Sequence, residues 1–223
     1  MTIRQTLRAS LLGIALIMFS APGPALAQSS QSIAGNLSEE DFAKLRADIE
    51  NDTLAPMANA DTYNVTVVVF SDYQCPYCRK IHPEIQSLVD GDSAVRVVYR
   101  DWPLFGEGSR EAARLAIAST FQGKHEEMNR ALMSIPGKLT PDKIQNVAVK
   151  AGVDWFRLQS DVEAHEPEIN ALLAKNSLQA ALLGLNGTPG ILIGPYLIPG
   201  AVDRATLQAA VKSVRESSAQ QRQ

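Results

Sequence analysis

The sequence contains only two cysteines, Cys75 and Cys78, among its 223 residues. Two cysteines are too few for a fold that disulfides hold together, so this chain must rely on one sizeable hydrophobic core. The sequence also has no internal repeat and only one long apolar run, which lies near its start. Positive charge is not in excess, because the formal net charge is −3. This mildly acidic balance argues against nucleic acid as a partner.

Residues 1–27 have the pattern of a secretory signal peptide. Two arginines precede the apolar run Leu11–Phe19, which is much shorter than the roughly 20 residues that span a bilayer. The small residues Ala25 and Ala27 are typical of a signal peptidase site, so we expect cleavage before Gln28. No cysteine follows this site closely enough to carry a lipid, and a retained membrane anchor is the alternative. Cleavage predicts a soluble protein of the periplasm, where disulfides form.

Residues 28–60 are expected to form a flexible leader followed by one short helix. The leader is polar and small, whereas Ser38 is well placed to cap a helix that begins with three acidic residues. Phe42, Leu45 and Ile49 would share one face of this helix. We expect that face to dock on the main body of the protein. Self-association through the same face is the alternative.

Residues 61–217 have the pattern of one α/β domain, and 218–223 read as a frayed tail. The β-branched run Val65–Phe70 predicts a buried strand. A helix follows the cysteines, with a kink expected at Pro83, and Ala94–Tyr99 predicts a second strand. Strand, helix and strand in this order imply a right-handed parallel crossover.

Helical patterns then dominate an insert at about residues 106–183. Its leucine stripes, including Leu178 and Leu182, are expected to be core, and its histidines, His125 and His165, to be solvated. Two short strands around Gly194 and a final amphipathic helix with Asp203 as its N-cap complete the pattern. The layout predicts an α/β fold with helices on both faces of the sheet.

The two cysteines form a CxxC pair, which can be either a structural staple or a redox centre. A disulfide that closes a loop of four residues removes little entropy from the unfolded chain, roughly 2 kcal/mol. Cys75 instead lies where the strand loop meets the following helix, and free amides there favour a thiolate. Pro76 suits the first helical turn, and Tyr77 can shape the redox potential. We therefore predict that Cys75 is an exposed reactive thiol and that Cys78, one turn further on, resolves its mixed disulfides.

Three segments together identify a family. "FSDYQCPYC" at 70–78, "RDWPL" at 100–104 and "GTPGILIG" at 187–194 resemble the DsbA-like branch of periplasmic thiol–disulfide oxidoreductases. The resemblance extends from Val65 to Val214 and implies a thioredoxin fold with an inserted helical subdomain. It also implies that Cys75 and Cys78 form the redox-active disulfide, with Cys75 as nucleophile.

The same resemblance implies a substrate site and partners. Pro189 would be a cis proline that faces the cysteines, and Thr188 before it would pair with the backbone of a client as an added strand. The clients would be unfolded or misoxidised exported proteins, and a membrane redox partner would recycle the pair without any cofactor. A cis proline beside the cysteines would also exclude a metal, so no metal site is expected.

Two residues depart from or divide the family. Many relatives have a buried acidic residue six positions before the first cysteine, where this chain has Val69, so its proton transfer needs another route. Thr188 resembles the isomerase and suppressor members, whereas the dedicated oxidase has valine. This choice leans towards shuffling or reducing disulfides, but the sequence leaves the direction of electron flow and the oligomeric state open.

Two other functions compete with the oxidoreductase. A periplasmic Cu(I) carrier needs only two thiolates, which Cys75 and Cys78 supply. An inert domain with a stapled loop is the third possibility. His82, four residues after Cys78, would share a helix face with the pair and can either tune the thiolate or remain a surface residue. The three together would underfill a tetrahedral zinc site.

Overall fold

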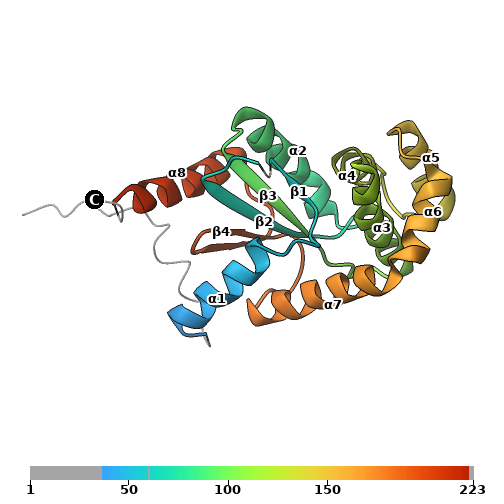
Figure 1. The fold of residues 1–223 in the computed structure, drawn as a ribbon. Helices are drawn as coiled ribbons and strands as arrows, with labels where there is room; N and C mark the ends of the chain where they lie inside the picture. The colour runs from blue at the N-terminus through green and yellow to red at the C-terminus, as the bar shows by residue number, and fades with distance from the viewer. Residues whose placement is uncertain (1–36, 60, 221–223) are drawn as a thin grey trace, which may run out of the picture.

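A computed structural model describes residues 37–59 and 61–220 of the chain. The predicted signal peptide and most of the leader lie outside the described residues. The described part confirms the α/β class: a mixed sheet lies between two helical layers, and a helical insert extends from one end of the sheet (Figure 1). None of its helices has both the length and the apolar character that crossing a membrane requires.

The sheet has five strands in the order β1-β3-β2-β4-β5. Its central pair, β2 and β3, is parallel, whereas the remaining pairs are antiparallel. Every residue of β2 is buried, as its continuous β-branched run predicted, and every residue of β3 is buried as well. The strand β1 was not among the predicted elements. The bounds are β1 Met57–Ala58, β2 Val65–Ser71, β3 Val95–Asp101, β4 Gly190–Ile193 and β5 Tyr196–Pro199.

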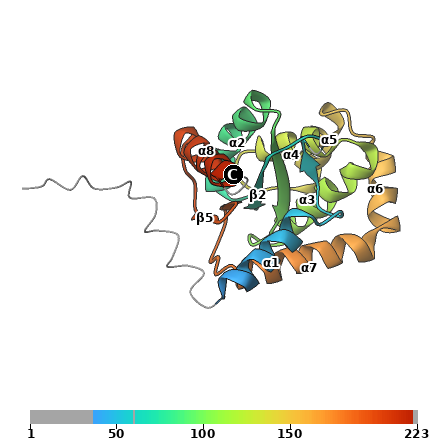
Figure 2. The ribbon, with the colours of Figure 1, turned by 60° about the vertical axis from the view of Figure 1, so that its left-hand side comes forward.

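The helices cover both faces of the sheet, as predicted. Helices α2 and α8 lie on one face and α1 and α7 on the other, while α3 to α6 form the insert beyond the sheet (Figures 1 and 2). A 3₁₀ turn, η2, follows α3. The bounds are α1 Glu39–Glu50, α2 Pro76–Gly91, α3 Glu107–Ala118, η2 Ser119–Gln122, α4 His125–Met133, α5 Pro141–Lys150, α6 Trp155–Ala164, α7 Glu166–Leu182 and α8 Arg204–Gln220.

Alternate residues of β2 supply the two halves of the core. Val67 and Val69 belong to the apolar cluster beneath α2 and α8, whereas Val68 and Phe70 belong to the cluster on the face of α1 and α7. This separation follows from the period of two in a strand. The two-sided burial fixes the register of the central strands, and hence the place where β2 ends.

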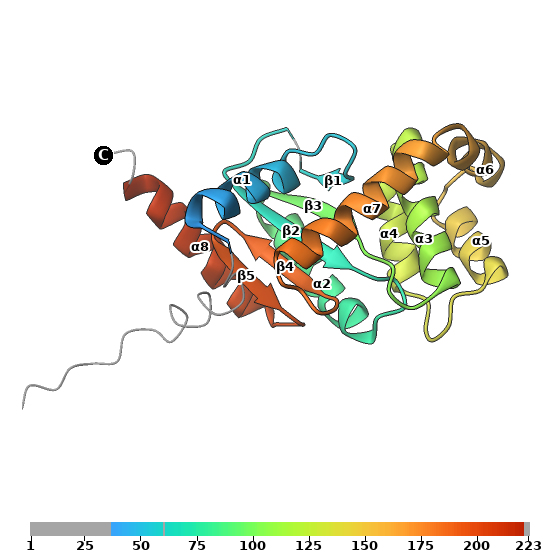
Figure 3. The same ribbon diagram turned by 90° about the horizontal axis from the view of Figure 1, so that it is seen from below.

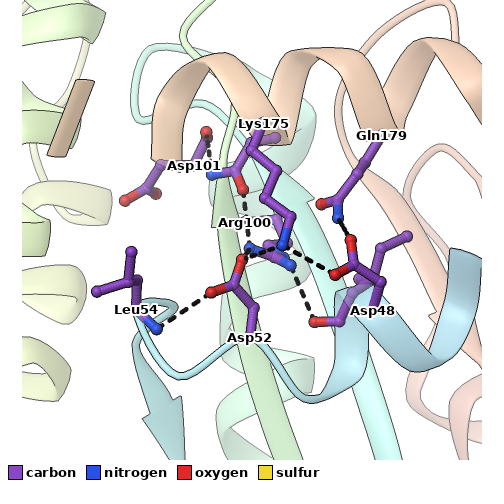
Figure 4. A network of polar contacts seen from close by, with 9 residues as sticks. Asp48, Asp52, Leu54, Arg100, Asp101, Lys175 and Gln179 are labelled. Atoms are coloured by element: carbon purple, nitrogen blue, oxygen red, sulfur yellow. Dashed lines mark hydrogen bonds and ion pairs between the residues drawn. The ribbon is translucent and has the colours of Figure 1, made fainter. Parts of the chain in front are cut away.

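Helix α1 docks on the main body, as predicted. It lies beside α7 across one face of the sheet (Figure 3). Arg100 of β3 is fully buried, and its guanidinium contacts Asp52 at 2.9 Å, the Asn176 side-chain oxygen at 3.1 Å and the Ile49 carbonyl at 3.0 Å (Figure 4). Burial alone would raise the pKa of Asp52, but hydrogen bonds from Arg100 and Lys175 hold it below its ordinary value. This ion-pair cluster joins three elements that are distant in sequence.

Several helical details differ from the sequence-based expectations. Helix α2 includes Pro83 and continues to Gly91, so the helix does not stop and restart at this proline. Leu178 and Leu182 are 60% and 47% exposed, so the prediction that they are core was wrong. They lie on the outer side of α7, whose buried face carries Leu172 and Leu173 instead. Helix α8 continues to Gln220 and includes part of the expected tail.

The two histidines of the insert were expected to be solvated, and for His125 this was wrong. His125 is only 5% exposed and lies against Tyr99, with 4.9 Å between the ring centroids. Burial lowers the pKa of His125 to about 3, so the imidazole is neutral. His165 is half-buried and stacks on Phe121 at 3.8 Å.

Candidate active site

The junction between β2 and α2 positions the first cysteine. Cys75 is the N-cap residue of α2, with an extended backbone, and Pro76 occupies the first helical turn, as predicted. The Cys75 amide donates to the Asp72 carbonyl at 3.1 Å, and the Cys75 carbonyl accepts from the Arg79 amide at 3.1 Å. These bonds hold the residue at the positive end of the helix dipole, which favours negative charge on the sulfur.

The loop before β4 lies directly against this cysteine. Phe70 of β2 pairs with Gly190 of β4, so the antiparallel register brings Thr188 and Pro189 to the end of β2. The Thr188–Pro189 peptide bond is cis, as the resemblance implied. The Cys75 thiol donates to the Thr188 carbonyl, with 3.2 Å between Sγ and O. Sequence positions 113 residues apart therefore form one site.

Both thiols are free and both are buried. Cys75 is 2% exposed and Cys78 is 1% exposed, so the prediction of an exposed reactive sulfur was wrong for this conformation. Part of the cause is the close approach of the Thr188 carbonyl, which a sequence pattern does not reveal. Tyr77, between the two cysteines, is 63% exposed, so solvent meets its aromatic ring rather than either sulfur.

The second thiol is a very weak acid in this environment. Burial raises the pKa of Cys78 to about 12, and the neighbouring Cys75 adds to the increase. The nearby Thr188 hydroxyl and the Asp72 backbone favour the thiolate but do not compensate for the loss of water. Attack by Cys78 on a mixed disulfide therefore needs a group that accepts its proton.

Asp72 is the polar centre of the loop, a role that the sequence did not suggest beyond capping or packing. It is 1% exposed, yet both carboxylate oxygens have partners. Oδ1 accepts from the Gln74 amide and the Ser109 hydroxyl, each at 2.7 Å. Oδ2 accepts from the amides of Leu104 at 2.5 Å and Phe105 at 3.1 Å. Asp72 thus fixes the segment after β3 beside the CxxC loop.

Gln74 extends this connection into the helical insert. Its side-chain nitrogen, Nε2, donates to the Phe105 carbonyl at 2.9 Å and to the Ser109 hydroxyl at 3.0 Å. Its side-chain oxygen, Oε1, accepts from the Leu139 backbone amide at 2.8 Å. As a result, exposed Leu104 and Phe105 are held beside the cysteine loop. Tyr77, Leu104 and Phe105 are thus three exposed apolar residues in or next to the cysteine loop, which we call the apolar rim.

A buried acid, Asp101, lies at the end of β3, opposite Ser71 of β2. It is 3% exposed, and neither carboxylate oxygen has a hydrogen-bond partner among the described residues. The nearby Tyr73 hydroxyl lowers the pKa of this carboxyl, but by less than burial raises it. Burial and the charge of Asp72 raise the pKa of Asp101 to about 7. The Tyr73 hydroxyl accepts from the Asn129 side chain at 3.1 Å.

The structure brings together all six predicted site residues: Cys75, Pro76, Tyr77, Cys78, Thr188 and Pro189. His82 also lies near the pair, on the same helix, and is half-buried rather than a surface residue. Over residues 37–59 and 61–220, no three His, Cys, Asp or Glu side chains gather as a metal site would require.

Comparison with known proteins gives a consistent result. A model of the DSBA-like thioredoxin domain matches residues 66–212. A thioredoxin-like oxidoreductase from Silicibacter pomeroyi DSS-3 is 44% identical, with a TM-score of 0.72 over 77% of this chain and 98% of that one. A periplasmic thioredoxin-like protein from Salmonella enterica serovar Typhimurium is 31% identical, with a TM-score of 0.68 over 77% and 95%. The thiol–disulfide exchange protein alpha-DsbA2 from Wolbachia pipientis is 25% identical, with a TM-score of 0.73 over 80% and 99%.

Curated relatives match only in part. The Na(+)/H(+) antiporter NhaA 1 of Salinispora arenicola is 28% identical over 151 residues, which are 67% of this chain but 23% of the antiporter. The chain thus spans about a quarter of the length of the curated relatives it matches. The family match, the structural relatives and the CxxC spacing agree with the fold described above. This chain belongs to the family of DsbA-like thioredoxin-fold proteins, which are thiol–disulfide oxidoreductases.

Proposed function

We propose that this protein is an exported thiol–disulfide oxidoreductase that forms or isomerises disulfides in client proteins through Cys75 and Cys78. One observation carries the proposal: the Cys75 sulfur lies at the N-terminus of α2 and 3.2 Å from the carbonyl of the residue before a cis proline. That arrangement combines a thiol at the positive end of a helix dipole with a backbone group that an extended peptide can use.

The chemistry follows from the positions of the two sulfurs. In the reducing direction, the Cys75 thiolate attacks a client disulfide, forms a mixed disulfide and expels one client thiolate. Cys78 then attacks Cys75, which releases the second client thiolate and leaves the Cys75–Cys78 disulfide. Oxidation of a client is the same sequence in reverse. Isomerisation needs only the first step and its reversal at another client sulfur.

Client recognition is assigned to backbone and apolar contacts. The Thr188 carbonyl accepts an amide from an extended client in place of the Cys75 thiol. The apolar rim consists of Tyr77, Leu104 and Phe105, which are 63%, 44% and 53% exposed. It lies in or next to the loop that carries Cys75. Such surfaces bind apolar side chains that unfolded proteins expose and folded proteins bury.

The periplasm is the proposed location, and a membrane protein is the proposed partner that recycles the pair. The Salmonella relative is itself periplasmic, which supports this location. The sequence of residues 1–27 supports it independently.

Activity assays with purified protein test the proposal. We expect the wild type to accelerate reduction of insulin by dithiothreitol and recovery of a reduced or scrambled client in a glutathione buffer. Cys75→Ser should abolish both activities, whereas Cys78→Ser should still capture the client as a stable mixed disulfide. The latter variant is a matched control, because it removes one thiol from the same helix but keeps the nucleophile.

Three outcomes would contradict the proposal. Wild-type rates equal to the rates without protein, or unchanged rates for Cys75→Ser, would exclude a redox role. A stoichiometric Cu(I) complex that survives a competing chelator, together with no thiol exchange, would favour a copper carrier. The potential of the Cys75–Cys78 couple against glutathione then decides direction, because an oxidising value indicates an oxidase and an intermediate value an isomerase.

A further inference from the structure

The resolving thiol shares a small cavity with an imidazole. Cys78 and His82 are four residues apart on α2, so their side chains are neighbours on one helix face. Between α2, α4 and the sheet lies a space of about 10 Å³, which is about the room that one water molecule needs. Most of its wall is apolar and includes Val69, Ile81 and Ile85, but Cys78, His82 and Asn129 also line it.

Two polar atoms of this wall are unsatisfied. Within the described part of the chain, neither Nε2 of His82 nor Oδ1 of Asn129 has a hydrogen-bond partner, and both atoms are buried. An unpaired buried polar atom costs roughly 1–3 kcal/mol, so two of them around one small cavity need an explanation. A role in moving a proton provides one.

We propose that His82 accepts the Cys78 proton, directly or through one water in this cavity, when Cys78 attacks the mixed disulfide at Cys75. The inference rests on the proposed function of the cysteine pair and assigns a residue to its second step. Asn129 orients the imidazole or the water through its free oxygen.

The surroundings of His82 keep its imidazole neutral but also make it a weaker base. Burial and the positive charge of Arg130 on α4 lower the pKa of His82 to about 4, so the imidazole is neutral at pH 7. Tyr99 of β3 also lines the cavity, and burial together with the charge of Glu126 raises its pKa well above the ordinary value, so it stays neutral. Burial opposes an isolated charge on either Cys78 or His82. A proton passed between them creates two opposite charges side by side, and each charge offsets the cost of the other.

The proposed step balances in atoms and electrons. The Cys78 S–H bond breaks and its proton moves to the imidazole. The Cys78 sulfur forms a bond to the Cys75 sulfur, and the bond between Cys75 and the client sulfur breaks. The client sulfur leaves with the electron pair and takes a proton from the imidazolium or from solvent. The two cysteines are oxidised and the client disulfide is reduced to two thiols.

The test separates the two steps with dithionitrobenzoate, an aromatic disulfide that releases one coloured thiolate in each. The rate of the first release is proportional to the reagent concentration and reports attack by Cys75. The rate of the second release is independent of that concentration and reports attack by Cys78. For the wild type we expect the second rate to be nearly constant between about pH 5 and pH 8, because the acceptor is internal. In His82→Gln we expect it to be at least about tenfold slower at pH 7 and to rise about tenfold per pH unit, because hydroxide must then remove the proton.

Two further variants keep the result interpretable. His82→Asn should behave as His82→Gln does, and His165→Gln, which removes an imidazole between α6 and α7, should leave both releases unchanged. A wild-type second rate that rises tenfold per pH unit would overturn the inference without any variant. An unchanged second rate in folded His82→Gln, or equal slowing of both releases, would also overturn it. Loss of the first release in the wild type would instead refute the proposed function itself.

Discussion

The buried carboxyl of Asp101 allows a quantitative prediction about stability. Its pKa is about 7 in the folded protein and 3.8 in the absence of burial. A difference of about 3 pKa units corresponds to about 4 kcal/mol of folding free energy. Asp101→Asn keeps the size of the side chain and removes the ionisation. The variant should therefore change how the free energy of unfolding depends on pH.

The sign follows from the direction of the shift. The folded state binds its proton more tightly than the unfolded state, so the contribution of Asp101 is fully present below about pH 4. It is lost as the pH rises to about 7 and is constant above that value. Relative to Asp101→Asn, the wild type should therefore lose about 4 kcal/mol between pH 3.5 and pH 8. A constant offset, caused by the new amide, does not affect this difference.

Urea unfolding of the reduced wild type and variant at several pH values measures the difference, because all other titrating groups cancel. Asp203→Asn is the matched control. Asp203 is exposed and caps α8, and hydrogen bonds from Thr206 lower its pKa. Its small contribution should therefore be lost as the pH falls, the opposite sense to Asp101. Parallel wild-type and Asp101→Asn curves from pH 3.5 to pH 8 would refute the reasoning.

Three further predictions concern packing and client binding. Arg100→Met should lower the free energy of unfolding by about 3–5 kcal/mol in urea, because it leaves a buried carboxylate less well paired; a loss below about 1 kcal/mol would contradict this. Phe105→Ser should lower kcat/KM several-fold with insulin and less with dithionitrobenzoate. Phe156→Ser, at an 86% exposed site, should change neither value, and equal rates for the two variants would exclude the apolar rim as a client-binding surface. Gly190→Ala should destabilise the protein by about 1–3 kcal/mol because a Cβ there lies 2.5 Å from a leucine methyl, whereas Gly187→Ala has open space; equal melting temperatures would argue against this.

Local patterns predicted the elements that carry the site. The β-branched run of β2 and its burial on both faces agreed with the structure, because a buried central strand has no polar face to interrupt the pattern. The N-terminus of α2 at Cys75 was also predictable, since Pro76 is compatible with the first helical turn but not with later ones.

Contacts between distant segments were not predictable from those patterns. Asp72 receives hydrogen bonds from residues more than 30 positions away, and a single aspartate before a cysteine gives no sign of them. His125 looks like a surface residue in the sequence because Lys124, Glu126 and Glu127 are next to it, yet it is buried in the fold. The CxxC spacing identified the cysteines but did not indicate what would cover them. Burial is a property of the assembled fold, so it becomes visible only when the insert and the cis-proline loop are in place.

The cover over Cys75 has a consequence for how clients react. The Thr188 carbonyl can accept from Cys75 only while the thiol keeps its proton, because an ionised sulfur and a carbonyl oxygen at 3.2 Å repel each other. Ionisation of Cys75 therefore frees the same carbonyl that an extended client needs for its amide. A client that donates this hydrogen bond would in turn take the acceptor away from the thiol. Binding of client backbone and release of the Cys75 sulfur would thus favour each other, so the proposed exchange would select clients that can offer an extended segment.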